Sequence, residues 1–246
     1  MNIEEEIKGF KVIDVHSHIG SYPLFNVTLN ADDLVKSMRK YSISRAIIFA
    51  YDNKSVEKAV RIHKELYGMV WANPKDSTTI KFLKAHLNEP KFVGVKLHPL
   101  LDGYLPVPEA LEEIMGLVKD AGWGVLVHCG HPPFTLPWSY ELLAEKFSDV
   151  PIVLGHMGHG NIVYINGCLE VAARRKNIYL ETSGMPMHTK IFEAVKTLGA
   201  ERVVWGSDVP FHHYAVELTK VCVAGLSKKE LERVLGLNAL NLFNIV

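Results

Sequence analysis

Short apolar stretches rich in β-branched residues alternate along the chain with longer segments whose apolar positions recur every three or four residues. The short stretches are typical of strands buried on both faces, and the longer ones of amphipathic helices. The predicted strands are residues 12–18, 45–50, 69–74, 92–99, 124–129, 152–156, 178–183 and 203–208. The predicted helices are residues 32–41, 55–67, 78–87, 108–121, 137–147, 162–175, 189–198 and 227–244.

This alternation predicts the fold class. Eight strands followed by helices in a chain of 246 residues favour an α/β fold, a closed (β/α)8 TIM barrel. An open doubly wound sheet is the alternative, but it would normally carry a glycine-rich phosphate loop after a strand, and the sequence has none. The sequence shows no internal repeat or domain-splitting linker, so residues 1–246 are expected to form a single domain.

Ionisable side chains follow the apolar runs at the carboxyl ends of five predicted strands. These residues are His16, His18, Lys96, His98, His128, His156 and Asp208. His16 and His18 are two apart, so a regular strand would point both rings to the same side. In a closed barrel the carboxyl ends of all strands meet at one face, where active sites form. The sequence therefore predicts one polar site built from distant parts of the chain.

The residue types at these strand ends are those of a metal site. Imidazole and carboxylate ligands suit Zn²⁺, with iron, manganese, cobalt and nickel as alternatives. The predicted ligands are His16, His18, His128 and Asp208. His156 either binds the metal or orients the reacting groups, and Asp208 is also predicted to move a proton during catalysis. One divalent ion is expected, most simply Zn²⁺.

Composition narrows the range of partners. Lys and Arg number 27, as do Asp and Glu, so the formal net charge is zero and a nucleic-acid partner is not expected. The three cysteines form no C-x-x-C pair, and the N-terminus lacks an apolar signal core. No uncharged apolar run reaches membrane-spanning length, so a cytoplasmic protein with no membrane partner is expected.

Several of these stretches resemble the amidohydrolase superfamily, in particular its amidohydrolase-related (amidohydrolase 2-like) branch of compact TIM barrels. The matching segments are residues 13–18, 94–99, 127–130, 154–159, 205–211 and 237–243. The resemblance implies a divalent metal held by His16, His18, His128 and Asp208, with His156 as a catalytic histidine. Superfamily members mostly hydrolyse amide or ester bonds, whereas relatives in this branch include non-oxidative decarboxylases and hydratases of small carboxylic acids.

For several other residues the sequence leaves two possible roles open. In binuclear members of the superfamily a carboxylated lysine on the fourth strand bridges two metals, so Lys96 could hold a second ion together with His128 and His156. Otherwise Lys96 pairs with an acid or with substrate. His98 either contacts substrate or caps the barrel, and Glu181 either orients a metal ligand or pairs within the barrel. Further substrate-contact candidates are Tyr22, His131, Phe134, His159, Met185, His188, His212 and His213.

The function predicted from these features is a metal-dependent hydrolase that uses a metal-activated water on a small-molecule amide, ester or lactone. A metal-dependent decarboxylase of a small carboxylic acid is the alternative, and a binding protein on a barrel without catalysis is a third. A small molecule is the expected substrate, and barrels of this type often form homodimers.

Overall fold

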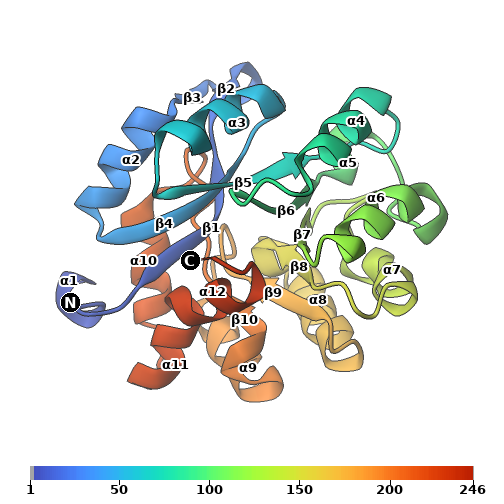
Figure 1. Ribbon diagram of the computed structural model, residues 1–246. Helices are drawn as coiled ribbons and strands as arrows, with labels where there is room; N and C mark the ends of the chain where they lie inside the picture. The colour runs from blue at the N-terminus through green and yellow to red at the C-terminus, as the bar shows by residue number, and fades with distance from the viewer. Residues whose placement is uncertain (1–2, 246) are drawn as a thin grey trace.

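The computed structural model describes residues 3–245, and they form a ring of parallel strands surrounded by helices (Figure 1). The strands of the main sheet pair in chain order, and this confirms the predicted TIM barrel. They are β1 (Val12–His18), β4 (Ile43–Phe49), β5 (Leu66–Trp71), β6 (Phe92–Leu97), β7 (Gly124–His128), β8 (Ile152–Gly155), β9 (Ile178–Glu181) and β10 (Val203–Val204).

The ring closes between its first and last strands. Strand β10 ends at Val204, but the chain after it continues along β1: the Val15 amide donates to the Trp205 carbonyl at 3.3 Å, and the Asp208 amide to the His16 carbonyl at 2.7 Å. The His18 amide donates to the Val209 carbonyl at 2.8 Å. These backbone bonds place Asp208 beside His16.

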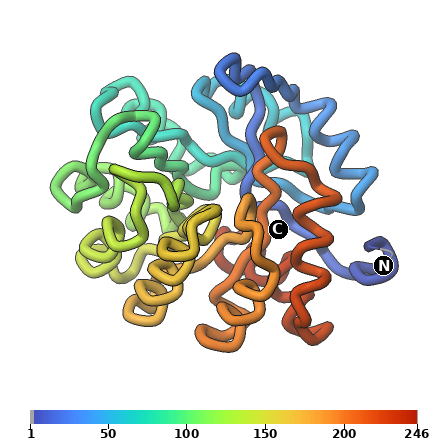
Figure 2. Tube along the Cα trace, turned by 180° about the vertical axis from the view of Figure 1, so that it is seen from behind, coloured from blue at the N-terminus to red at the C-terminus, as the bar shows by residue number. Residues whose placement is uncertain are grey.

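Helices cover the outside of the ring and one of its ends. They are α1 (Ile3–Glu6), α2 (Ala31–Lys40), α3 (Asn53–Ile62), α4 (Ser77–His86), α5 (Pro99–Asp102), α6 (Pro108–Asp120), α7 (Glu141–Lys146), α8 (Ile162–Arg174), α9 (His188–Leu198), α10 (Tyr214–Cys222), α11 (Lys228–Glu232) and α12 (Asn238–Leu242). Helix α1 lies on the outside of the barrel beside α10, as the view from behind shows (Figure 2). No helix among the described residues is long and apolar enough to span a membrane.

The core has two parts. The larger packs the helices against the outer face of the sheet, and the smaller fills the barrel with residues such as Ile13, Phe49 and Leu126. Ala239 and Phe243 belong to the inner part, so the C-terminal segment around α12 closes the amino end of the barrel (Figure 1). With one end closed, the polar strand ends at the other end are left to form the site.

The structure corrects the prediction for residues 55–67. Helix α3 ends at Ile62, and Gly68 lies within β5 rather than after a helix. A Cβ atom on Gly68 would lie 2.9 Å from Val56 Cγ1 and 3.0 Å from the Phe92 ring. The glycine is therefore required for close packing of α3 and β6 on β5, which a local pattern does not reveal.

Other elements also differ from the prediction. The loop after β1 forms a small hairpin of β2 (Gly20–Tyr22) and β3 (Val27–Leu29), and α10 was not predicted. The predicted helix 227–244 is divided by a π-helical turn, Arg233–Leu237. Within that turn a Cβ on Gly236 would clash with the Lys11 carbonyl oxygen, so glycine is required where the backbone approaches the start of β1.

Helix α11 begins with a capping box that offers a simple test of stability. The Ser227 hydroxyl accepts the Glu230 amide, and the Glu230 carboxylate accepts the Ser227 amide at 2.8 Å. We expect Ser227→Ala to lower the free energy of unfolding by about 1 kcal/mol, because one amide loses its acceptor. Denaturant unfolding measures this change. Ser227→Asp keeps an acceptor and serves as the control; equal losses in both variants would contradict the capping role.

Candidate functional site

A pocket of about 530 Å³ opens at the carboxyl ends of the barrel strands. One part of its lining is polar: His18, Lys96, His98, His128, His131, His156, His159, Asp208 and His212. The other part is aromatic or aliphatic: Tyr22, Phe25, Val27, Tyr51, Trp71, Leu100, Leu101 and Phe211. Such an apolar cavity with a polar cluster is the usual form of a small-molecule site.

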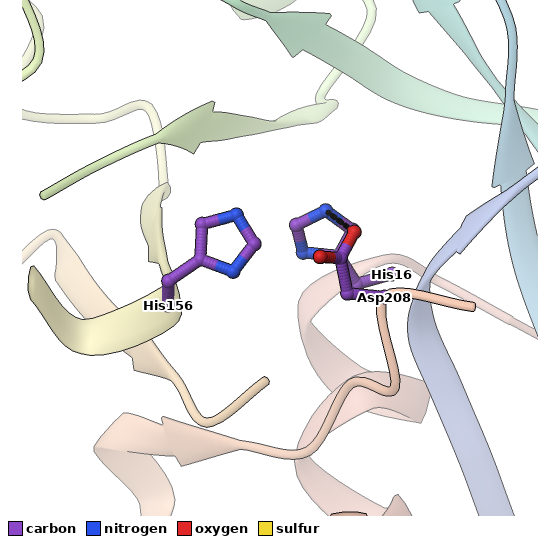
Figure 3. A group of neighbouring side chains, drawn as sticks. All are labelled: His16, His156 and Asp208. Atoms are coloured by element: carbon purple, nitrogen blue, oxygen red, sulfur yellow. Dashed lines mark ion pairs between the residues drawn. The ribbon is translucent and has the colours of Figure 1, made fainter. Parts of the chain in front are cut away.

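Three of the predicted residues form a group that can hold a metal ion. One ligand atom each from His16, His156 and Asp208 lies within 4.8 Å of the others, and all three side chains are buried. Figure 3 shows the His156 ring facing the His16 ring and the Asp208 carboxylate across a short gap. The three residues come from β1, from the turn after β8 and from the segment after β10.

His16 is fully buried, and each of its ring nitrogens has polar neighbours. Nδ1 lies 2.8 Å from Glu181 Oε2, while Nε2 lies 3.3 Å from Asp208 Oδ1 and 3.2 Å from Lys96 Nζ. Burial, with the nearby Lys96 charge, lowers the pKa of His16 well below its usual value. The ring is therefore neutral, the form in which imidazole binds metals.

His18 shows a similar arrangement. Its Nδ1 lies 3.2 Å from the Tyr22 hydroxyl, which donates its own proton to the Ile19 carbonyl at 3.2 Å. The hydroxyl therefore accepts from Nδ1–H, and the neutral ring has its lone pair on Nε2. That nitrogen lies 3.1 Å from Asp208 Oδ1. Burial lowers the pKa of His18 well below its usual value.

The separations of these atoms fit a metal ion. Two ligand atoms bound to one tetrahedral Zn²⁺ at about 2.0–2.1 Å are roughly 3.3 Å apart. The Nε2 atoms of His16 and His18 lie 3.3 and 3.1 Å from the same oxygen of Asp208. The predicted convergence of both rings is thus observed, although β1 is not a regular strand and its register shifts between Asp14 and Ser17.

Asp208 is held in an unusual backbone conformation. Its φ of 54° lies in the left-handed region, which costs non-glycine residues about 1–3 kcal/mol and often marks functional positions. Burial raises the pKa of its carboxyl to about 7, against the lowering effect of Lys96 and His212. Its Oδ2 lies 3.6 Å from His212 Nε2. A carboxyl with such a pKa can take up and release a proton near neutral pH.

Lys96 is fully buried on β6 at the edge of this group. Its Nζ lies 3.2 Å from His16 Nε2 and 4.8 Å from the centre of the Phe49 ring. Burial lowers the pKa of Lys96 to about 8, while the Asp208 and Glu181 charges oppose that shift. Both roles considered for Lys96, as a bridge to a second metal and as a contact to an acid or to substrate, are compatible with this position.

His128 and His98 lie next to the group of three. His128 Nδ1 lies 3.1 Å from His156 Nε2, and its ring stacks on His98 with centroids 4.0 Å apart. His128 Nε2 lies 2.9 Å from His131 Nδ1. The ligand role of His128 stays a prediction, because its two nitrogens face other histidines here. His98 stacks on Trp71 as well, so it supports the pocket wall.

Only some of the other residues predicted to contact substrate line the pocket. Tyr22, His131, His159 and His212 line the pocket, whereas Phe134, Met185, His188 and His213 lie outside its lining. Sequence reasoning missed the apolar wall, including Phe25, Tyr51, Trp71 and Phe211. Tyr51 and Phe211 follow predicted strands, and that position could have identified them. Trp71 ends β5 but fell in the middle of the predicted strand 69–74. Phe25 belongs to the hairpin, which the sequence did not predict.

Comparison with known proteins agrees with this architecture. Residues 13–245 match the sequence model of the family described as amidohydrolase. A curated relative, gamma-resorcylate decarboxylase from Polaromonas sp. (strain JS666 / ATCC BAA-500), is 28% identical over 120 residues, which cover 42% of this chain and only 37% of that protein.

Solved structures share the fold at low sequence identity. The 5-carboxyvanillate decarboxylase from Novosphingobium aromaticivorans, complexed with manganese, is 13% identical, with a TM-score of 0.78 over 99% of each chain. A putative 2-pyrone-4,6-dicarboxylic acid hydrolase from Pseudomonas putida is 18% identical, with a TM-score of 0.74 over 96% of this chain and 98% of that one. Since the family model covers nearly the whole sequence, the chain belongs to the amidohydrolase family.

Proposed function

We propose that this protein is a metal-dependent hydrolase that cleaves an amide, ester or lactone bond of a small molecule. The observation that carries the proposal is the convergence of His16 and His18 Nε2 on Asp208 Oδ1 beside the pocket. A bound divalent metal would lower the pKa of a water molecule and polarise the substrate carbonyl. Zn²⁺ is proposed because histidine nitrogens dominate the donor set.

The side chains around Asp208 Oδ1 have separate proposed roles. His16, His18 and Asp208 would hold the metal, with His128 or His156 completing the set. Asp208 would also take the proton of the attacking water and return it to the leaving group. A neutral His156, whose unprotonated Nε2 lies toward His128, would orient the attacking water from the opposite side of the gap by accepting a hydrogen bond from it (Figure 3).

The pocket wall indicates the kind of substrate. Aromatic side chains such as Tyr51, Trp71 and Phe211 contribute much of the lining, and Tyr22 and Phe25 pack on Phe211 with ring centroids 5.1 and 5.0 Å apart. These rings form an apolar wall that favours a flat, largely apolar molecule. We therefore propose a small cyclic substrate.

A decarboxylase is the second candidate, and one feature of the pocket favours it. Lys96 is the sole lysine or arginine among the pocket-lining residues that the structure describes. A single buried cation beside an aromatic wall suits a small aromatic acid with one carboxylate. The curated relative from Polaromonas and several solved structures of this fold are named as decarboxylases.

Isotope labelling separates the two reactions. The metal-loaded enzyme is incubated in H₂¹⁸O with a panel of lactones, esters, amides and aromatic carboxylic acids, and the products are analysed by mass spectrometry. We expect ¹⁸O in the new carboxyl group of a cleaved lactone, ester or amide. Release of CO₂ from an acid, with no cleavage of the other compounds, would replace the hydrolase proposal with the decarboxylase. A metal-loaded protein inert toward the whole panel would contradict both.

A further inference from the structure

A buried carboxylate behind the predicted metal ligands joins three parts of the site. Glu181 ends β9 and has no exposed surface. Its Oε1 accepts the Ser183 amide at 2.5 Å, and its Oε2 accepts the His156 amide at 3.1 Å and the Ser183 hydroxyl at 2.8 Å. Oε2 also lies 2.8 Å from His16 Nδ1. Glu181 thus contacts residues from β1, from the segment after β9 and from the turn after β8.

The proton positions in this network follow from the chemistry of the partners. A carboxylate surrounded by two backbone N–H groups and a hydroxyl is an acceptor, so His16 Nδ1 must donate to it. A neutral ring protonated at Nδ1 has its lone pair on Nε2. The neighbour on that side agrees, because the Lys96 ammonium, 3.2 Å from Nε2, is a donor and needs an acceptor.

The hydrogen-bond partners of His156 also determine which of its ring nitrogens carries the proton. Its Nδ1 lies 3.2 Å from the Ser183 carbonyl oxygen, which can only accept, and 3.0 Å from the Ser183 hydroxyl. The proton therefore lies on Nδ1, and Nε2 accepts from His128 Nδ1 at 3.1 Å. His128 Nε2 then accepts from His131 Nδ1 at 2.9 Å. Each ring in this chain therefore donates to the next, from His131 at the pocket rim through His128 to His156 in the interior.

Glu181 also secures the backbone of His156. The φ of His156 is 68°, and that of Met157 is 44°, so two consecutive residues without glycine's freedom occupy the left-handed region. Such a conformation persists only where surrounding contacts hold it. The bond from the His156 amide to Glu181 Oε2 is one such contact, and it fixes the direction in which the ring enters the site.

We propose that Glu181 is a positioning residue that keeps the proton of His16 on Nδ1 and, through Ser183, orients His156, so that both rings turn an unprotonated Nε2 toward the site. This role rests on the proposed metal-dependent function, since an unprotonated Nε2 is what a metal ligand requires. The carboxylate acts behind the ligands rather than on substrate. Such outer contacts typically change metal affinity by about 10–100-fold.

Two carboxylates compete for the single proton of His16 in the metal-free protein. Glu181 lies 2.8 Å from Nδ1, and Asp208 lies 3.3 Å from Nε2. The shorter contact, made by a carboxylate with no exposed surface, favours the Nδ1–H form. Glu181→Gln removes the charge of the nearer acceptor, so a share of His16 should move its proton to Nε2, facing Asp208.

Nitrogen NMR on histidine-labelled, metal-free protein reads the proton positions directly. His16→Asn and His156→Asn spectra assign the two rings. We expect Nδ1–H for both rings in the unsubstituted protein, and an Nε2–H form of either would overturn the proposal. Because this measurement needs no change at Glu181, a Glu181→Gln chain that failed to fold would leave the test intact.

Zn²⁺ titration of the variants completes the test. Glu181→Gln should raise the Zn²⁺ dissociation constant by about 10–100-fold and increase the Nε2–H share of His16. Glu141→Gln is the control: Glu141 pairs with Arg174 away from the pocket, with Nε–Oε1 at 2.8 Å, and its variant should bind Zn²⁺ as the parent does. Unchanged Zn²⁺ affinity and unchanged tautomers in Glu181→Gln would overturn the proposal. An enzyme inert toward all substrates that still shows both effects would contradict the proposed function alone.

Discussion

Asp208→Asn is expected to lower kcat/KM by roughly 10²–10⁴-fold or more, the range for loss of a catalytic proton-transfer group. The substitution keeps the size of the side chain but removes its charge and its ability to take up a proton. Asp208 Oδ1 is the atom on which His16 and His18 converge, so metal affinity should fall as well. Steady-state kinetics and Zn²⁺ titration of the same preparation measure both effects.

The fold should survive this change, because the backbone amide of Asp208, not its side chain, bonds the His16 carbonyl and helps to close the barrel. Asp149→Asn provides a matched control: Asp149 pairs with Lys119 on the exposed surface and should tolerate the same substitution with full activity. Full activity of Asp208→Asn, or an equal loss in both variants, would refute the assigned role.

Removal of metal is expected to abolish activity, and Zn²⁺ or Mn²⁺ should restore it. Without a cation between them, the buried lone pairs of His16 and His18 and the Asp208 carboxylate face one another at 3.1–3.3 Å. Metal at about 100-fold above its dissociation constant stabilises a protein by ~2.7 kcal/mol, which for a chain of this size raises Tm by roughly 5–10 °C. Calorimetry of chelated and reloaded protein measures the shift.

Elemental analysis of the reloaded protein gives the number of ions. We expect one per chain, and the Tm increase should be much smaller in Asp208→Asn, which lacks one ligand. Two ions per chain with a carbamate on Lys96 would contradict the single-ion prediction. Full activity in protein shown to be free of metal would contradict the metal-dependent reading altogether.

Much of the barrel could be predicted because its signals are local. Strands buried on both faces must be apolar almost throughout, so the runs that became β4, β6 and β8 stand out from the helices around them. The predicted element boundaries were wrong where the choice of residue depends on packing against residues distant in the sequence. Gly68 resembles a helix terminator, yet its lack of a side chain is needed because Val56 and Phe92 both pack where its Cβ would be.

In the candidate site, the polar residues could be predicted from the sequence and the aromatic wall could not. Residue order alone shows which side chains stand at strand ends, and it therefore predicts that His16, His18, His156 and Asp208 share one face of a barrel. It did not reveal the aromatic wall contributed by the hairpin and the strand ends, since a wall depends on which loops meet across the mouth.

The orientation and proton position of each histidine ring depend on contacts that form only in the folded barrel. Barrel closure brings Asp208 to the Nε2 atoms of His16 and His18, while Tyr22 and Glu181 occupy their Nδ1 sides. Residue type and spacing specify that an imidazole is present. Its proton position depends on acceptors that arrive from other strands, and those contacts exist only in the closed barrel.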